Sequence, residues 1–389
     1  MGADPRRLAE KLTLGAVLVG IAYAATAIVQ LRTFARRRNE MPPALEPRPA
    51  VSIIKPVCGI EPQLEENLRS FCVQDYPRYE VLFGVHDGSD PTLDVIRRVA
   101  GGAPGRTAVV VGDGVARFRN PKMTNVAPMV ARARGEILVI SDSDMRVTPD
   151  YLDAVTAPFA DPHVGAVTAV YRGEPADESL ASVLGAMCLT EQFTPSTLVA
   201  CAIEPVRFMF GSTMAVRREV LSAIGGIEAL GDHLADDFAL GRLVTEKGYL
   251  VAVARCVVVN VVAERNLRAL FEHELRWART IRAIRPLNYR GIVLTYPLPL
   301  ALAHLVLARD KRPALVLALV AALLRLGIHH AAHAAMGSWS RPPRRLIPLR
   351  DAFGVAVWAR GLWGRTILWR DQKLRIAESD RLARQSGSR

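Results

Sequence analysis

The sequence lacks the short motifs of several common protein classes. No GxGxxG follows its first expected strand, where KPVCGIEP carries the single glycine Gly59, and no GxxxxGK[ST] occurs. These absences argue against a nicotinamide-type dinucleotide site and against a glycine cradle for phosphates. The five cysteines form no CxxC pair and no ligand-like spacing with histidine, which argues against a zinc site and suits a reducing cytoplasm.

Acidic residues are fewer than basic ones. The chain holds 38 of the former and 50 of the latter, for a net charge of +12, and much of the surplus lies at 268–290 and 341–389. Both regions adjoin long apolar segments. Basic clusters beside a membrane suit anionic lipid headgroups, so we expect the bilayer as a partner and no nucleic acid.

Apolar residues concentrate towards the two ends of the chain. Residues 12–29 (LTLGAVLVGIAYAATAIV) carry no charge and are long enough to cross the hydrocarbon core. Arginines follow the run closely, which favours a retained anchor over a cleaved signal. Further apolar runs cover 292–308 and 314–336, and the first of these either spans or forms a re-entrant hairpin at its prolines.

This distribution predicts three parts. We expect a membrane anchor with its juxtamembrane segment at 1–40, a catalytic domain with interfacial helices at 41–290, and a membrane and basic tail region at 291–389. The charge bias around the anchor places the catalytic domain in the cytoplasm.

Short apolar runs alternate with amphipathic stretches after the anchor. Strands are expected at 51–55, 80–86, 107–112 and 136–141, and helices at 61–71, 92–100 and 122–134. Such alternation is typical of βαβ units in a parallel α/β sheet.

Acids follow two of these strands. Asp87 comes directly after the second, while Asp142 and Asp144 come after the fourth. Ligands of open α/β sheets bind at the carboxyl ends of the strands. A D-x-D pair there offers hard oxygen ligands to Mg²⁺ or Mn²⁺, which bridges phosphate oxygens. The alternative is a solvated turn whose aspartates cap the helix expected near Pro149.

Three more stretches carry candidate residues. NPKMTNV contains Lys122, DHLADDFALG contains Asp236 and Asp237, and HELRWARTIR contains Arg276 and Trp277. Each has an ordinary explanation alone: a solvated lysine, a helix cap, and a basic and an aromatic residue at a membrane interface. Their order along one chain is harder to explain without a shared site.

Three histidines, at 329, 330 and 333, lie within the second apolar run of the tail. Ionisable groups at membrane depth often have a function. A contact with a lipid headgroup is preferred here to metal binding.

The chain resembles family 21 of the GT-A glycosyltransferases, the group of ceramide glucosyltransferase and bacterial hopanoid-associated glycosyltransferases. The matching stretches lie within residues 51–282 and are SIIKPVCGIEPQLEENLRSF, QDYPRYEVLFGVHDGSDP, NPKMTNV, SDSDMRVTPDYL, LADDFALG and ELRWARTIR. The resemblance implies a GT-A α/β fold with one N-terminal anchor and an α-helical membrane region after it.

The resemblance also implies residue roles. Asp87 would contact the nucleotide, and Asp142 with Asp144 would hold the cation and the diphosphate. Asp237 would be the catalytic base, with Asp236 as the reserve candidate. The N-x-K-x-x-N stretch implies substrate contacts for Lys122 and Asn125, and the closing signature implies the same for Arg276 and Trp277. His273 departs from that signature, which usually begins with Gln or Arg.

The implied activity is inverting transfer from a UDP-sugar, N-acetylglucosamine or glucose, to a lipid hydroxyl. A hopanoid such as bacteriohopanetetrol is the first acceptor candidate and ceramide the second. The implied location is the bacterial inner membrane, in a multi-pass arrangement. A processive polysaccharide synthase and a non-enzymatic sugar-nucleotide binder are the further alternatives.

Overall fold

The computed structural model describes residues 4–40, 44–103, 105–337, 341–369, 372–376 and 381–383. The chain forms two compact units. The sheet unit comprises Arg37–Asp177, Pro205–Ala263 and Leu374–Arg389. The helical unit comprises Met1–Arg36, Glu178–Glu204 and Glu264–Lys373.

The sheet unit is built on an eight-stranded sheet of order β3-β2-β1-β4-β7-β6-β8-β5. Its strands are β1 (Val51–Pro56), β2 (Tyr79–Val85), β3 (Thr107–Val111), β4 (Ile137–Ile140), β5 (Met145–Arg146), β6 (Val164–Pro175), β7 (Met214–Arg217) and β8 (Leu250–Val262). The strands β3, β2, β1 and β4 run parallel to one another, which confirms the expected βαβ half.

The rest of the sheet is mixed, which the alternation did not predict. Strand β7 runs antiparallel to both of its neighbours, β4 and β6, and β5 is antiparallel to β8. The chain leaves the sheet unit after β6, at Asp177, and returns at Pro205. Tertiary packing sets the direction of a strand that follows such a long insertion, and hydrophobic periodicity carries no information about it.

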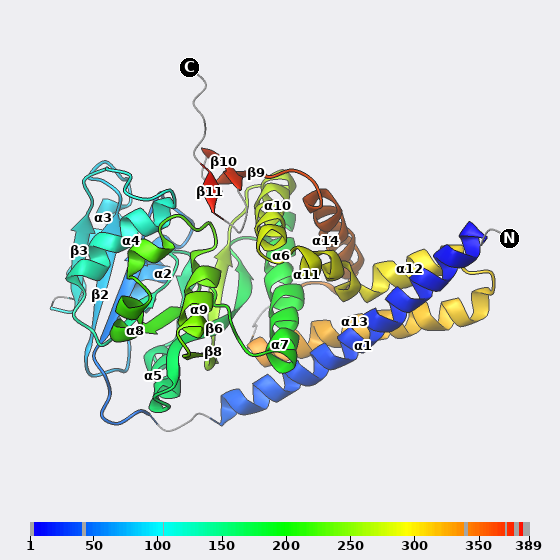
Figure 1. The fold of residues 1–389 in the computed structure, drawn as a ribbon, viewed down its shortest axis with the longest axis horizontal. Coiled ribbons are helices and arrows are strands. Elements are labelled where there is room, and N and C mark those ends of the chain that lie inside the picture. The colour runs from blue at the N-terminus through cyan, green and yellow to red at the C-terminus, as the bar shows by residue number, and fades with distance from the viewer. Residues whose placement is uncertain are drawn as a thin grey trace, which may run out of the picture. The chain divides into compact units, whose positions relative to one another are not determined.

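Helices cover both faces of this sheet (Figure 1). They are α2 (Leu64–Ser70), α3 (Leu93–Gly101), α4 (Pro121–Arg132), α5 (Tyr151–Thr156), α8 (Arg218–Ala223) and α9 (Asp236–Glu246), with 3₁₀ turns η1 (Ala157–Ala160) and η3 (Ile227–Leu230). Ile53 and Ile54 point to opposite faces: the first joins a core with α2, α3 and α5, and the second a core with α4, α8 and α9.

Local chemistry fixes where the site-bearing helix α4 begins. The Asn120 side chain accepts hydrogen bonds from the Lys122 and Met123 amides, and Pro121 occupies the first helical position. An Asn cap followed by Pro is a strong helix start. It sets Lys122 in the first turn of α4.

The helical unit contains α1 (Pro5–Asn39) and a broken helix of α6 (Leu180–Cys188), the π-helical segment η2 (Leu189–Phe193) and α7 (Thr194–Ile203). It continues with α10 (Leu267–Ile284), α11 (Pro286–Gly291), η4 (Ile292–Thr295), α12 (Pro297–Leu307), α13 (Lys311–Met336), η5 (Arg344–Leu346), α14 (Ile347–Gly361) and β9 (Thr366–Trp369). Strands β10 (Gln372–Ile376) and β11 (Leu382–Ala383) follow and pair antiparallel.

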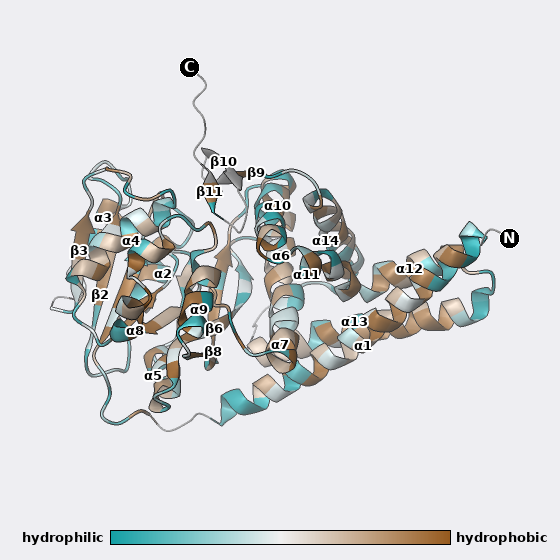
Figure 2. Cartoon of the chain, in the orientation of Figure 1, coloured by the Kyte–Doolittle hydropathy of each residue, from teal (hydrophilic) through white to brown (hydrophobic). Residues whose placement is uncertain are grey.

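Two helices, α1 and α13, are long and apolar enough to cross a membrane. A third candidate is the bent pair Pro286–Thr295 and Pro297–Leu307, whose halves meet at 74°, as a broken span or a re-entrant loop would. Helices α1 and α13 pack side by side, with Gly327 against Ile28, and apolar residues cover most of both (Figures 1 and 2). These helices indicate membrane association.

Candidate active site

A lysine and three carboxylates meet where β4 ends. The Lys122 ammonium on α4 lies 2.8 Å from Asp142 Oδ1 and 2.9 Å from Asp236 Oδ2. Burial opposes the charge of Lys122, but the carboxylates of Asp142 and Asp236 outweigh it and raise its pKa. The lysine therefore stays protonated. Its charge neutralises part of the negative charge of the acid group, which is formed by Asp142, Asp236 and Asp237.

The backbone of Gly211 joins Asp142 to Asp237. Its carbonyl accepts a hydrogen bond from the Asp142 amide at 3.2 Å, and its own amide donates to Asp237 Oδ2 at 3.1 Å. A Cβ at position 211 would collide with the Asp142 carboxylate. Only glycine permits this approach, so Gly211 is a site residue that the sequence motifs did not mark.

The two adjacent aspartates of α9 have different surroundings. Asp236 is held by Lys122 and by the Asn120 side-chain amide, which lies 3.3 Å from its Oδ1. Asp237 accepts only backbone amides among its described hydrogen bonds, from Gly211 and from Phe238. Burial and the neighbouring Asp236 raise the pKa of Asp237 to about 7.

In the described structure, one carboxylate oxygen of Asp144 accepts a hydrogen bond and the other does not. Asn260 donates to its Oδ2 at 2.7 Å, while Oδ1 is buried without a hydrogen-bond partner. Burial, then Glu61 and Asp142, raise the pKa of Asp144 to about 7. An orphaned carboxylate oxygen among other acids fits a divalent cation, which would hold the acids ionised.

Two charged residues near this group were not among the expected ones. Lys55, fully buried on β1, donates to the Asp142 carbonyl and lies 3.8 Å from the centre of the Phe71 ring. Burial lowers the pKa of Lys55 to about 7. Glu61 accepts a hydrogen bond from Ser143 at 2.9 Å. Both residues sit in stretches that read as an ordinary strand and an ordinary helix, so only the fold identifies them.

Asp87 and Asn125 lie elsewhere along the same sheet edge. Asp87 follows β2, which is separated from β4 by β1 alone, and hydrogen bonds from Ser89 lower its pKa. The Asn125 amide donates to the carbonyls of Val57 and Gly84 at 3.2 and 2.9 Å. Asn125 thus ties together the carboxyl ends of β1 and β2, and its substrate role stays a prediction.

Arg276 and Trp277 belong to the helical unit, on α10. The ring of His273 lies 4.4 Å from that of Trp277, and its Nδ1 lies 2.5 Å from Glu264 Oε1. The residue that departs from the family signature therefore orients the tryptophan one turn away. The parts that Arg276 and Trp277 play remain predictions.

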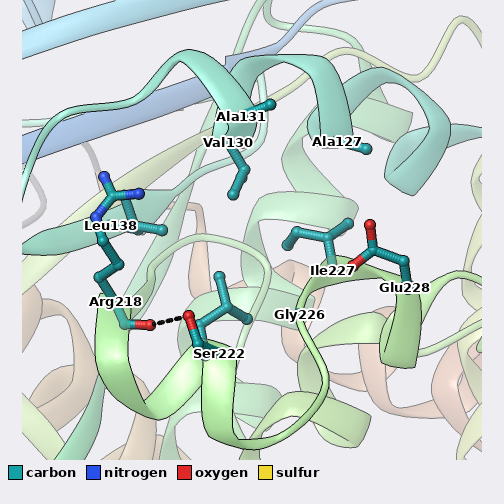
Figure 3. A pocket seen from close by; sticks show the side chains of 10 residues that line it. Ala127, Val130, Ala131, Leu138, Arg218, Ser222, Gly226, Ile227 and Glu228 are labelled. Carbon is teal, nitrogen blue, oxygen red and sulfur yellow. Dashed lines mark hydrogen bonds between the residues drawn. The ribbon is translucent and has the colours of Figure 1, made fainter.

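A separate hollow lies on the α4 and α8 side of the sheet unit (Figure 3). Val130 and Ala131 of α4 line it opposite Ser222, whose hydroxyl donates to the Arg218 carbonyl at 3.0 Å. None of the expected site residues is among the described residues that line it. The hollow is therefore distinct from the acid group.

Comparison with known proteins gives consistent results. Residues 12–382 match the model of glycosyl transferase family 21. Ceramide glucosyltransferase 1 of Caenorhabditis elegans is 26% identical over 279 residues, which cover 70% of this chain and 58% of that protein. Beta-monoglucosyldiacylglycerol synthase of Synechocystis sp. is 26% identical over 274 residues, or 68% of this chain and 56% of that protein. The chain thus spans under two thirds of these relatives' length.

The fold is shared with a solved structure. It is the mannosyltransferase PcManGT of Pyrobaculum calidifontis in complex with GDP-Man and Mn²⁺, at a TM-score of 0.54 and 24% identity, covering 90% of this chain and 99% of that one. The expected GT-A glycosyltransferase fold is confirmed.

Proposed function

Because the chain belongs to glycosyl transferase family 21, we propose that it transfers a sugar from a nucleotide diphosphate sugar to the hydroxyl of a membrane lipid. The observation that carries this proposal is the meeting of Asp142, Asp236 and Asp237 around Lys122 and Gly211. Carboxylates gathered at a strand end repel one another unless cations offset their charge. Lys122 offsets part of it, and a divalent cation held by these carboxylates would offset more.

Asp237 is the proposed base. In the reaction the lipid oxygen forms a bond to the anomeric carbon, the bond from that carbon to the diphosphate breaks, and the hydroxyl proton passes to Asp237. Two backbone amides orient its carboxylate. A pKa near neutrality suits a group that must accept a proton and release it again.

The surroundings of Asp236 support its place as the reserve candidate. Its carboxylate is paired with Lys122 and is 5% exposed. Lys122 and the Asn120 side-chain amide already lie against its two oxygens. Asp236 therefore suits the task of holding Lys122 better than that of a base.

Asp142 and Asp144 are the proposed ligands of Mg²⁺ or Mn²⁺. A bound divalent cation supplies neutralisation of the charge that develops on the leaving diphosphate. Lys122 adds a fixed positive charge beside the same carboxylate. We assign Asp87, Asn125, Arg276 and Trp277 to contacts with the nucleotide sugar.

The proposed donor is a UDP-sugar, carrying glucose or N-acetylglucosamine. For the acceptor, the names of the relatives support ceramide or diacylglycerol. A hopanoid such as bacteriohopanetetrol rests on the sequence resemblance alone. All three lipids carry a free hydroxyl at the headgroup, so the same chemistry serves each.

The membrane arrangement completes the proposal. Residues 1–40 anchor a catalytic domain at 41–290, and 291–389 return to the membrane. The catalytic domain lies at the bacterial inner membrane and faces the cytoplasm, the compartment that supplies nucleotide sugars. Two long apolar helices and one bent pair support membrane association.

The test uses the full chain in lipid nanodiscs with Mn²⁺ and a radiolabelled UDP-sugar. Ceramide, diacylglycerol and a hopanoid polyol are supplied in turn, and both UDP release and labelled lipid are measured. Asp237→Asn should lower transfer about 10²–10⁴-fold, the usual share of a general base, and should leave nucleotide binding intact. Asp94→Asn, at an exposed position of α3, is the matched control.

Each alternative gives a different result. Nucleotide binding without UDP release, whichever lipid is present, would indicate a sugar-nucleotide binder and overturn the proposal. Labelled polymer instead of labelled lipid would indicate a processive synthase. Full turnover by Asp237→Asn would remove that residue from the role of base.

A further inference from the structure

A second charged cluster lies inside the helical unit. Glu191 of η2 accepts from Arg325, His329 and His333 of α13, at 2.9, 2.9 and 3.0 Å. Arg325 also pairs with Asp351 of α14 at 2.9 Å. All five side chains are almost completely buried, at 0 to 4% exposure. No step of the proposed sugar transfer uses them.

The backbone is irregular at Glu191. The broken helix changes from α-helical to π-helical over Leu189–Phe193 and resumes as α7. Such π segments are frequent at functional sites. Here the segment carries the only acid of the α6–α7 helix.

The cluster is short of positive charge. Glu191 and Asp351 bring two negative charges, Arg325 brings one positive charge, and the imidazoles are neutral unless protonated. Buried carboxylates are costly without full compensation. The missing positive charge must come from a proton on an imidazole or from a bound cation.

We propose that Glu191, His329 and His333 form a binding site for a divalent transition metal such as Zn²⁺. The candidate ligand atoms are Glu191 Oε1, His329 Nδ1 and His333 Nε2, which lie within 4.8 Å of one another. Ligand atoms about 2.1 Å from a tetrahedral zinc ion are about 3.4 Å apart. Glu191 Oε1 now lies at hydrogen-bond distance from both nitrogens, 2.9 and 3.0 Å, so the ion would replace the ring protons once these atoms move apart by about 0.5 Å.

The residue types select the metal. Imidazole nitrogens suit Zn²⁺ and other late transition metals, whereas Mg²⁺ prefers oxygen ligands alone. His329 and His333 are four residues apart on α13 and so share one face of that helix. The sequence favoured a lipid headgroup contact over metal binding for these histidines. The proposal favours metal binding instead, because the rings of His329 and His333 are buried against Glu191.

The surroundings fix how Glu191 would bind. Arg325 occupies Glu191 Oε2, which leaves Oε1 for the ion, and Asp351 holds the Arg325 side chain from its other edge. Such outer contacts orient a ligand and tune its affinity. The ion would tie η2 to α13, two segments 138 residues apart between Glu191 and His329. Its role is structural and lies within the helical unit.

The test measures metal content of the full chain purified in detergent, loaded with Zn²⁺ and then passed into metal-free buffer. We expect about one zinc per chain, held by these three side chains. His329→Gln and His333→Gln should lose it. His330→Gln is the matched control, because His330 adjoins His329 on the same helix and is not one of the three ligands. A chain with both Asp142→Asn and Asp144→Asn should keep its zinc.

Two outcomes would overturn the proposal. One is a wild-type chain that retains no zinc although its thermal unfolding shows it to be folded, which would leave the cluster as an ion-pair network. The other is equal zinc retention by the His329 and His333 variants and the wild type. Cobalt replacement gives an independent readout, because Co²⁺ bound to imidazole absorbs visible light and needs no variant.

Discussion

The Gly211 amide donates a hydrogen bond of 3.1 Å to the carboxylate of Asp237. The same residue accepts from the Asp142 amide through its carbonyl. One peptide segment between two distant motifs therefore sets the separation of the proposed base from the proposed cation ligand. This relationship makes position 211 more sensitive than any motif suggests.

Gly211→Ala should reduce transfer without unfolding the chain. The added methyl group would collide with the Asp142 carboxylate and push it from its place. Displacing a reactive group by about 1 Å can cost on the order of 10²-fold in rate. Steady-state transfer and nucleotide affinity are the measurements, and a variant as active as wild type would contradict the geometry.

Gly101→Ala provides the control for this substitution. Gly101 ends α3, and a Cβ there would meet no atom within 4 Å. Its transfer rate should equal that of the wild type. A loss common to both variants would indicate a general effect of replacing glycine.

The pH dependence should reveal a base with a raised pKa. Asp237 accepts a proton only as a carboxylate, and its pKa is about 7. As pH falls through 7 the carboxylate is protonated, so the rate should fall, approaching about tenfold per pH unit in more acidic solution. Saturating Mn²⁺ would keep Asp144 ionised and leave Asp237 as the titrating group. A rate that stays flat on the acid side would contradict the assignment.

The sequence predicted the first half of the sheet well. Strand and helix positions from β1 to β4 agree within a few residues. The strands β1, β2 and β4 are buried on both faces and read as continuous apolar runs, while the edge strand β3 reads as one although it is mostly exposed or half-buried. The carboxylates after β4 were recognisable because two charges end such a run. The fold class follows from this half.

The remaining site residues could not be predicted. Gly211 lies in no motif, and only the folded structure shows that a side chain there would displace the Asp142 carboxylate. Lys55 occupies a strand position, where a lysine reads as solvent-facing although it is fully buried. Glu191 meets His333 across 142 residues of chain. Partnerships at such separations depend on tertiary packing, to which local patterns are blind.

Lys122→Met should destabilise the sheet unit. It would leave Asp236, which is 5% exposed, without its ammonium partner. Removing one partner of a buried ion pair costs about 3–5 kcal/mol of the free energy of unfolding. The contribution of the Lys122–Asp142 pair is smaller than this, because Asp142 is partly exposed to solvent. Denaturant unfolding of the detergent-purified chain measures the loss.

An exposed ion pair supplies the comparison for Lys122. Arg242 and Glu246 are 2.7 Å apart on α9, with side chains 40% and 54% exposed. Arg242→Met should cost less than about 1 kcal/mol because water already screens the pair. Equal losses of unfolding free energy in the two variants would show that burial does not make the Lys122 ion pair more important for stability than an exposed one.

Gly20→Leu should weaken the packing of α1 inside the helical unit. A Cβ at Gly20 would lie 3.1 Å from the Leu294 carbonyl oxygen and 3.3 Å from Pro297 Cα, at the break of the bent helix pair. Small residues let membrane helices approach closely, and overpacking costs about 1–3 kcal/mol. Thermal unfolding in detergent should therefore shift to lower temperature. Gly15→Leu, five residues earlier on α1, where no atom would lie within 4 Å of the added Cβ, should leave the unfolding temperature unchanged. If both variants unfold like the wild type, the contact between α1 and the bent pair does not contribute to stability.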